Sequence, residues 1–185
     1  MVAIPAGFDP EAYLQLEEQA SIRHEFRLGS VYAMAGGSAN HNRIAINLVT
    51  ALNLHFSNDR CQFFSGDVKL NYAERFYYYP DVFVTCDPRD FEDAYIKRYP
   101  TLIAEVTSRS TDGFDREQKF EDYRCLESLE EYVLISQEVQ RVEVFRRGLG
   151  WDCLRFGAGD RVVFESIGLE VAIGDLYRGT DVADG

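Results

Sequence analysis

The chain has 185 residues, of which 46% are hydrophobic and 27% are charged. These proportions exclude a fibre or a disordered protein and are typical of a globular domain. The formal net charge is -12 at pH 7, which argues against indiscriminate nucleic-acid binding, because such affinity comes largely from cations that neutralise phosphates. No apolar run approaches the ~20 residues needed to cross a bilayer, and the first residues lack a signal-peptide pattern, so we expect a cytoplasmic protein without a membrane partner.

The cysteines are widely separated and form no C-x-x-C pair, which excludes a zinc knuckle and a redox motif. We expect all of them to be reduced and packed. They are Cys61, Cys86, Cys125 and Cys153.

The first third of the chain predicts a helix, a hairpin and a longer helix. Asp9 and Pro10 form a helix start, with the aspartate as N-cap and the proline at the first helical position. Two strands over residues 23–28 and 30–35 flank Gly29. Apolar residues then recur at three- and four-residue spacing, which predicts an amphipathic helix over 40–56.

The remainder predicts strands interrupted by one helix. We expect strands at residues 62–65, 68–72, 76–79, 81–86 and 101–106, a surface excursion with a helical turn at 87–99, a helix over 115–126, and strands at 131–136, 141–147, 151–156 and 161–165. The tail after Gly179 is small and polar and is expected to fray. The pattern favours an α/β protein, with a mixed sheet flanked by two helices. We expect one domain over 1–185, ordered over about 9–178.

Two carboxylates interrupt the apolar strands. Glu105 stands within an otherwise apolar run, and Asp81 opens the run that follows Pro80. A buried carboxylate is costly unless it is paired or coordinates a cation. Two carboxylates at strand ends can share a hard divalent ion such as Mg²⁺ or Mn²⁺, which would support phosphodiester hydrolysis.

Lys119 stands fourteen residues after Glu105, near the start of the second predicted helix. Its ammonium group could reach the strand end, where it would position the attacking water or neutralise charge on the phosphate. Its sequence neighbours Arg109, Arg116 and Arg124 form the most plausible phosphate-facing cluster.

These residues stand in an order that resembles a known family. The segments Tyr79-Pro80-Asp81-Val82, then 104–111 (AEVTSRST), then 115–119 (DREQK) with Tyr123 are similar to the Uma-type putative restriction endonuclease family. Residues 23–29 (RHEFRLG), 38–41 (SANH) and 131–135 (EYVLI) also match its pattern, so the resemblance spans nearly the whole chain.

The resemblance implies a restriction-endonuclease-like PD-(D/E)XK core, in which an Asp, a Glu and a Lys assemble at one end of a mixed sheet. It implies Asp81, Glu105 and Lys119 as catalytic residues, with Glu25 as a further metal ligand. DNA is the expected substrate and a homodimer the expected assembly, since double-strand cleavage commonly uses two sites. Two positions depart from the patterns: Thr107 stands where the superfamily motif has its lysine, and Arg109 stands where the Uma-type family commonly has proline.

Each candidate also has a structural interpretation. Asp81 alone could be a strand-entry residue bonded to backbone amides, and Lys119 could pair with Asp115 or Asp122 on a solvated helix face. Glu25 could pair with a neighbouring arginine on an exposed strand. His41 could contact phosphate or metal, or cap and pack its helix.

At the level of the whole protein, two hypotheses remain. The first is a metal-dependent endonuclease, with Arg109, Arg116 and His41 as substrate-binding residues. The second is a binding or regulatory module that keeps the nuclease scaffold without useful turnover, which the acidic net charge and Thr107 favour.

Overall fold

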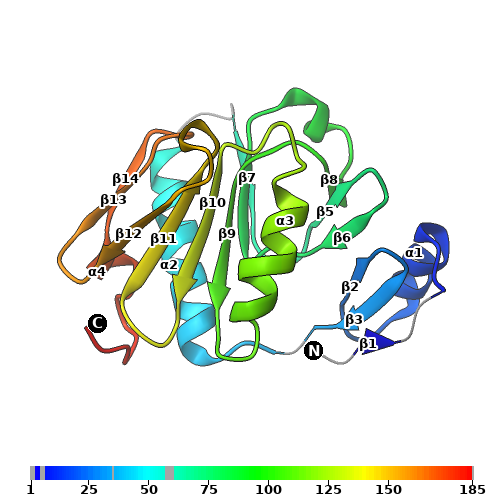
Figure 1. The fold of residues 1–185 in the computed structure, drawn as a ribbon, viewed down its shortest axis with the longest axis horizontal. Coiled ribbons are helices and arrows are strands. Elements are labelled where there is room, and N and C mark those ends of the chain that lie inside the picture. The colour runs from blue at the N-terminus through cyan, green and yellow to red at the C-terminus, as the bar shows by residue number, and fades with distance from the viewer. Residues whose placement is uncertain (1–2, 5–6, 35, 57–60, 185) are drawn as a thin grey trace.

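A computed structural model of the chain describes residues 3–4, 7–34, 36–56 and 61–184. Within them the strands form two six-stranded sheets and a two-stranded hairpin, and helices lie against the sheets (Figure 1). This arrangement confirms the predicted α/β class with mixed β-structure flanked by helices, although the strands divide between two large sheets where one mixed sheet was expected. None of the described helices combines the length and the apolar character needed to span a membrane. One domain over 1–185 stays a prediction.

The central sheet carries most of the core. Its strands in spatial order are β12 (Cys153–Gly157), β11 (Arg141–Arg146), β10 (Glu131–Ser136), β9 (Pro100–Thr107), β7 (Val82–Thr85) and β4 (Gln62–Phe64). β9 and β10 run parallel, and the other neighbours in this sheet are antiparallel. β7 is buried along its whole length, and β9 at seven of its eight positions, as expected for strands covered on both faces.

The second sheet brings an N-terminal hairpin against the middle of the chain. Its strands in spatial order are β1 (Ala3–Ile4), β3 (Ser30–Ala33), β2 (His24–Arg27), β6 (Phe76–Tyr78), β5 (Lys69–Tyr72) and β8 (Ile96–Lys97). Helix α1 (Pro10–Gln19) begins as predicted, with Asp9 accepting a hydrogen bond from the Ala12 backbone N–H at 2.7 Å. Because β2 pairs with β6, Glu25 on β2 is carried to the end of the central sheet near β7.

Two helices cover opposite faces of the central sheet (Figure 1). Helix α2 (Ala39–His55) buries Ile44, Leu48 and Leu52 against β7 and β9, in agreement with its predicted apolar face. The helix predicted over 115–126 is instead a π-helical turn, η2 (Phe114–Lys119), continued by α3 (Phe120–Tyr123). Such wide turns often occur at functional sites.

The C-terminal part contains the strands predicted over 151–156 and 161–165, together with a turn, a strand and a short helix that the sequence left unassigned. The turn η3 (Arg147–Leu149) precedes β12, and β13 (Arg161–Phe164) pairs with β14 (Leu169–Ala172) before α4 (Ile173–Leu176), which packs on α2. The tail was expected to fray, but the Ala183 carbonyl accepts a hydrogen bond from the Gln140 N–H at 3.1 Å, and Asp181 bonds to Asn40. These contacts hold the tail beside the turn between β10 and β11.

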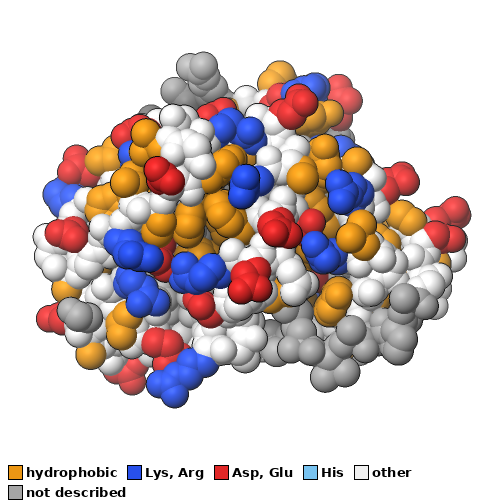
Figure 2. Space-filling view, viewed as in Figure 1, with side chains coloured by type: hydrophobic (Ala, Val, Ile, Leu, Met, Phe, Trp, Pro, Cys, Tyr) orange, Lys and Arg blue, Asp and Glu red, His pale blue; other side chains and the backbone are white. Residues whose placement is uncertain are grey.

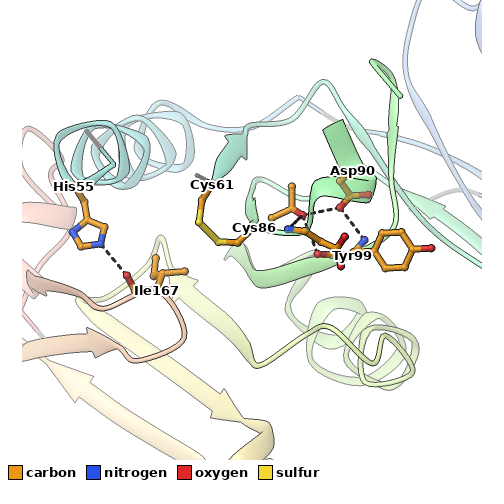
Figure 3. Close-up of a disulfide and its surroundings, with 8 residues drawn as sticks. His55, Cys61, Cys86, Asp90, Tyr99 and Ile167 are labelled. Atoms are coloured by element: carbon orange, nitrogen blue, oxygen red, sulfur yellow. Dashed lines mark hydrogen bonds between the residues drawn. A yellow bond between two sulfur atoms is a disulfide. The ribbon is translucent and has the colours of Figure 1, made fainter. Parts of the chain in front are cut away.

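Two features of the region around residues 61–99 differ from expectation. Cys61 and Cys86 form a disulfide, so the prediction of four reduced cysteines is wrong (Figure 3). Spacing along the chain did not reveal the bond, because the two residues become neighbours only when β4 and β7 pair. The excursion at 87–99 contains the expected helical turn, η1 (Pro88–Phe91), but it also contributes β8 and buries Asp90 and Lys97.

Candidate active site

Asp81 and Glu105 meet where β7 begins and β9 approaches its end. The antiparallel register pairs Val82 with Ala104, which sets Asp81 opposite Glu105. The Asp81 N–H donates to Glu105 Oε2 at 3.2 Å, and the Val106 N–H donates to Asp81 Oδ2 at 2.7 Å. The two carboxylates predicted to converge therefore line one cavity.

Lys119 reaches this pair from the π-helical turn η2. Its Nζ lies 3.0 Å from Glu105 Oε1, 3.0 Å from Glu25 Oε1 and 3.7 Å from Asp115 Oδ1. Tyr123, one turn further along, donates its hydroxyl to Glu105 Oε1 at 2.9 Å. The Lys119 ammonium group therefore links three carboxylates from different elements: Glu25 of the second sheet, Glu105 of the central sheet and Asp115 of η2.

The buried charges of this site do not balance. Burial raises the pKa of Glu25, Glu105 and Asp115, and the Lys119 ammonium only partly opposes that rise. For Lys119 itself burial lowers the pKa, but the three carboxylates outweigh it, and its pKa lies well above the ordinary lysine value. Lys119 is therefore charged at neutral pH. With Asp81, four carboxyl groups surround one ammonium, so the cluster must hold protons or attract a further cation.

His41 completes the site from the first turn of α2. Its Nε2 lies 3.0 Å from Asp81 Oδ2, and its backbone N–H donates to the N-cap Ser38 Oγ at 3.1 Å. Burial lowers the His41 pKa, but the hydrogen bond and charge of Asp81 overcome this and raise it. A β-carbon on Gly37 would stand 2.8 Å from His41 Nδ1, so glycine at this position leaves room for the ring.

These side chains surround a cavity of about 330 Å³. Its floor is polar and comes from both sheets, α2 and η2: Glu25, His41, Asp81, Glu105, Asp115 and Lys119. Small hydroxyl residues after β9 form part of its wall: Ser108, Ser110 and Thr111. The volume falls at the lower end of the range for small-ligand sites.

The donor set fits a hard divalent ion held by few protein ligands. Asp81 and Glu105 offer carboxylate oxygens on neighbouring strands, and Mg²⁺ is commonly held by one or two carboxylates together with water and substrate oxygens. Among the described residues, no three His, Cys, Asp or Glu side chains are arranged to enclose an ion. Glu25, the third predicted ligand, has its Oε1 engaged by Lys119 Nζ and by the Tyr79 N–H at 3.2 Å.

The predicted phosphate-facing arginines do not gather at the cavity. The Arg109 side chain is 89% exposed and pairs with Glu138. Arg116 points toward β11, where it bonds to Glu143, and Arg124 lies over the Phe120 ring. Of the three predicted substrate-binding residues, His41 alone lines the cavity.

Sequence reasoning assigned no active-site role to two residues that the structure brings to the centre. Asp115 stands four residues before Lys119, and from the sequence it was considered only as a partner of Lys119 on a solvated helix face, the alternative to a catalytic lysine. Tyr123 was noted only as part of a pattern, although its hydroxyl bonds to Glu105. The sequence held a signal for both: Asp115, Lys119 and Tyr123 are spaced by four residues, and residues at that spacing along a helix share one face.

An Asp and a Glu on adjoining strands of a mixed sheet, with a Lys from the following helix, define a restriction-endonuclease-like α/β protein. The sequence pattern of the Uma2 family, described as "Putative restriction endonuclease", matches residues 10–172. The chain belongs to this family.

Two relatives and one solved structure are similar to most of the chain. An uncharacterized protein of Synechocystis sp. (slr1290) is 38% identical over 173 residues, covering 92% of this chain and 91% of the relative. A second uncharacterized Synechocystis protein (sll1609) is 44% identical over 138 residues, covering 73% of this chain and 78% of that relative. A crystal structure from Anabaena variabilis, described as a putative nuclease belonging to DUF820, superposes with a TM-score of 0.78 at 18% identity, over 92% of this chain and 98% of that one. At this low identity the superposition shows a shared fold.

Proposed function

We propose that the protein is a metal-dependent endonuclease that hydrolyses phosphodiester bonds of DNA. The observation that carries the proposal is the meeting of Asp81 and Glu105 beside the Lys119 ammonium in one cavity. The matched family is described as "Putative restriction endonuclease" and the structural neighbour as a "putative nuclease", and both descriptions support the same class of reaction.

Asp81 and Glu105 are the proposed holders of Mg²⁺ or Mn²⁺, which would polarise a phosphoryl oxygen and lower the pKa of bound water. The chain's own residues supply positioning and charge. Tyr123 and Lys119 both donate hydrogen bonds to Glu105 Oε1. The other oxygen, Oε2, faces Asp81 and accepts its backbone N–H. His41 and the Val106 N–H likewise fix Asp81 through Oδ2. Interactions of this kind hold ligating carboxylates in one orientation.

Lys119 acts electrostatically in this proposal. Since its pKa lies above the ordinary value, the side chain stays protonated at neutral pH and cannot act as a general base. It is suited to neutralise charge that builds on the phosphate during attack by water. Glu25 and Asp115 hold the ammonium at the cavity floor. Glu25 serves here chiefly as a partner of Lys119, and a direct role for it at the metal stays a prediction.

A binding or regulatory module is the second candidate. It is favoured by Thr107 in place of the motif lysine and by the net charge of -12. Such a protein would keep the cavity but turn over no nucleic acid. A homodimer and a cytoplasmic location also stay predictions.

A cleavage assay separates the two candidates. Purified protein is incubated with plasmid and single-stranded DNA in Mg²⁺ or Mn²⁺, beside Asp81→Asn and, as a matched acidic control, Glu170→Gln on β14. An endonuclease cuts with the wild type and the control but not with Asp81→Asn. Cutting that survives Asp81→Asn contradicts the assignment.

Metal titration by calorimetry tests the ion directly. Because burial raises the pKa of Glu105 and Asp115, these carboxyls keep protons to higher pH than usual. A metal ion requires the ionised form, so binding should release protons, and affinity should rise with pH. Repeating the titration in buffers of different ionisation enthalpy measures that release. Absence of both heat and cleavage favours the second candidate.

A further inference from the structure

We propose that three arginines grouped over β11 and β12 of the central sheet bind nucleic-acid phosphates beyond the cleavage cavity, an inference that rests on the proposed function. Arg116 from η2, Arg141 from β11 and Arg155 from β12 converge on the carboxylate of Glu143. The distances to its oxygens are 2.6, 3.6 and 3.0 Å, respectively.

The cluster holds more positive charge than Glu143 requires. The Glu143 side chain is 5% exposed and needs a partner, which Arg116 supplies at the shortest distance. Arg116 also pairs with Asp112. Arg141 and Arg155 remain 44% and 71% exposed, so three guanidinium groups face two carboxylates on a chain whose net charge is -12. Guanidinium forks match phosphate oxygens, and a local excess of them forms an anion site.

The register of the sheet aligns this cluster with the cavity. Glu105 on β9 is level with Leu134 on β10, which is level with Glu143 on β11, which is level with Arg155 on β12. Neighbouring strands lie about 4.8 Å apart, so Arg155 stands roughly 14 Å from Glu105 along this row. A duplex places one phosphate per strand about every 3.4 Å of its axis. The distance from Glu105 to Arg155 therefore corresponds to about four phosphates along one strand, counted from the cleavage point.

The side chains of this row also share one face of the sheet. Glu105 contacts Lys119, and Glu143 contacts Arg116, both from the same turn η2. Figure 2 shows this face, with Lys and Arg side chains around an area of hydrophobic side chains over β11 and β12. An acidic protein surface could match the charge too, but alignment with the cavity favours a nucleic-acid backbone.

Binding to a labelled DNA duplex of about 20 base pairs at several salt concentrations tests the proposal. All proteins carry Asp81→Asn so that the DNA stays intact. Arg141→Gln/Arg155→Gln is compared with the parent and with Arg161→Gln, a control on β13 whose arginine is 57% exposed and pairs with Glu170. The double substitution keeps the Arg116–Glu143 pair, and thermal unfolding checks that it folds.

We expect the double variant to bind DNA more weakly and with a salt slope shallower by about two, one for each lost phosphate contact. Arg161→Gln should match the parent, and Arg155→Lys should keep most of the parent's slope because lysine retains the charge. An unchanged slope in the double variant overturns the proposal. So does a shift to a smaller species in sedimentation, since a second copy would then occupy this face.

The outcome is separable from that of the proposed function. Wild-type protein that cuts DNA, together with a double variant that binds like the parent, overturns the arginine site alone. Wild-type protein that never cuts, but whose binding depends on Arg141 and Arg155, overturns the endonuclease and supports the arginine site.

Discussion

Each end of β7 lies beside an acidic group, half-buried Asp81 at one end and buried Asp90 at the other, but the two groups have different surroundings. At the start of the strand, Asp81 stands in the open cavity with Glu105, and carboxyl groups there outnumber the cations. At the other end, Thr85 Oγ1 donates to Asp90 Oδ2 at 2.8 Å, and Asp90 is 2% exposed. Asp81 therefore lines a cavity that can admit a ligand, whereas Asp90 is enclosed by protein.

The partners of Asp90 explain why that end is structural. Its carboxylate also accepts the Arg98 N–H at 2.7 Å and the Tyr99 N–H at 2.9 Å, the latter drawn in Figure 3. Lys97 Nζ, also buried, donates to the Asp90 carbonyl at 2.5 Å. Donors from the chain itself thus satisfy Asp90, whereas the Asp81 end keeps excess negative charge. Burial alone does not mark a functional acid; the balance of its partners does.

The largest expected effect concerns catalysis at the cavity end. Glu105→Gln keeps the shape of the side chain but removes the charge that the proposed ion and Lys119 both use. We expect DNA cleavage to fall by at least about a hundredfold, the scale seen when one electrostatic contact to a reacting centre is lost. Initial rates under saturating metal measure the effect, and a rate within twofold of wild type would contradict the role of Glu105.

At the opposite end of β7 the corresponding change should reduce stability instead. Asp90→Ala leaves the backbone N–H groups of Arg98 and Tyr99 without their acceptor, whereas the Thr85 hydroxyl keeps the Tyr99 carbonyl as a partner. Unsatisfied buried donors cost about 1–3 kcal/mol each, so we expect a loss of several kcal/mol in the free energy of unfolding. Urea denaturation measures it, and the rate per folded molecule should stay at the wild-type value. A stable but inactive Asp90→Ala protein would remove the distinction between the two ends.

The disulfide also lies at this structural end, between the start of β4 and the residue after β7 (Figure 3). Cys61 and Cys86 are separated by 25 residues, and a cross-link closing a loop of that length stabilises by about 3.5 kcal/mol in the chain-entropy model. Reduction, or the Cys61→Ala/Cys86→Ala variant, should lower the melting temperature without changing cleavage below it. The Cys125→Ala variant is the matched control, because Cys125 is an exposed free thiol.

Periodicity and cap residues were enough to predict α1, α2 and β9. Their signals are local: Asp9 and Pro10 define a start, and apolar spacing defines a face. The convergence of Asp81 and Glu105 was also accessible, because both carboxylates interrupt core strands and so need a shared explanation. What local patterns could not provide was strand pairing, and pairing brings Cys61 to Cys86.

The arginines illustrate the same limit at the site. Arg109, Arg116 and Arg124 are close in sequence, but the fold turns them in different directions. Arg116 instead meets Arg141 and Arg155 from strands that follow it in the chain. Proximity in sequence predicts contact along one helix face, whereas contact across a sheet depends on register, which the sequence alone did not resolve.

The smallest expected effect concerns the contact between His41 and Asp81 in the cavity. A β-carbon at Gly37 would lie 2.8 Å from His41 Nδ1 and 3.1 Å from Cγ, so Gly37→Ala must displace the ring that holds Asp81. A β-carbon at Gly36 would meet nothing within 4 Å, which makes Gly36→Ala the matched control for the same loss of backbone freedom.

We expect Gly37→Ala to lower DNA cleavage by about tenfold, the lower end for a residue that orients a metal ligand. Calorimetric metal affinity should weaken in parallel, with Gly36→Ala unchanged in both. Equal rates for the two variants would mean that His41 does not position Asp81, and the N-cap contact to Ser38 would then be its main role.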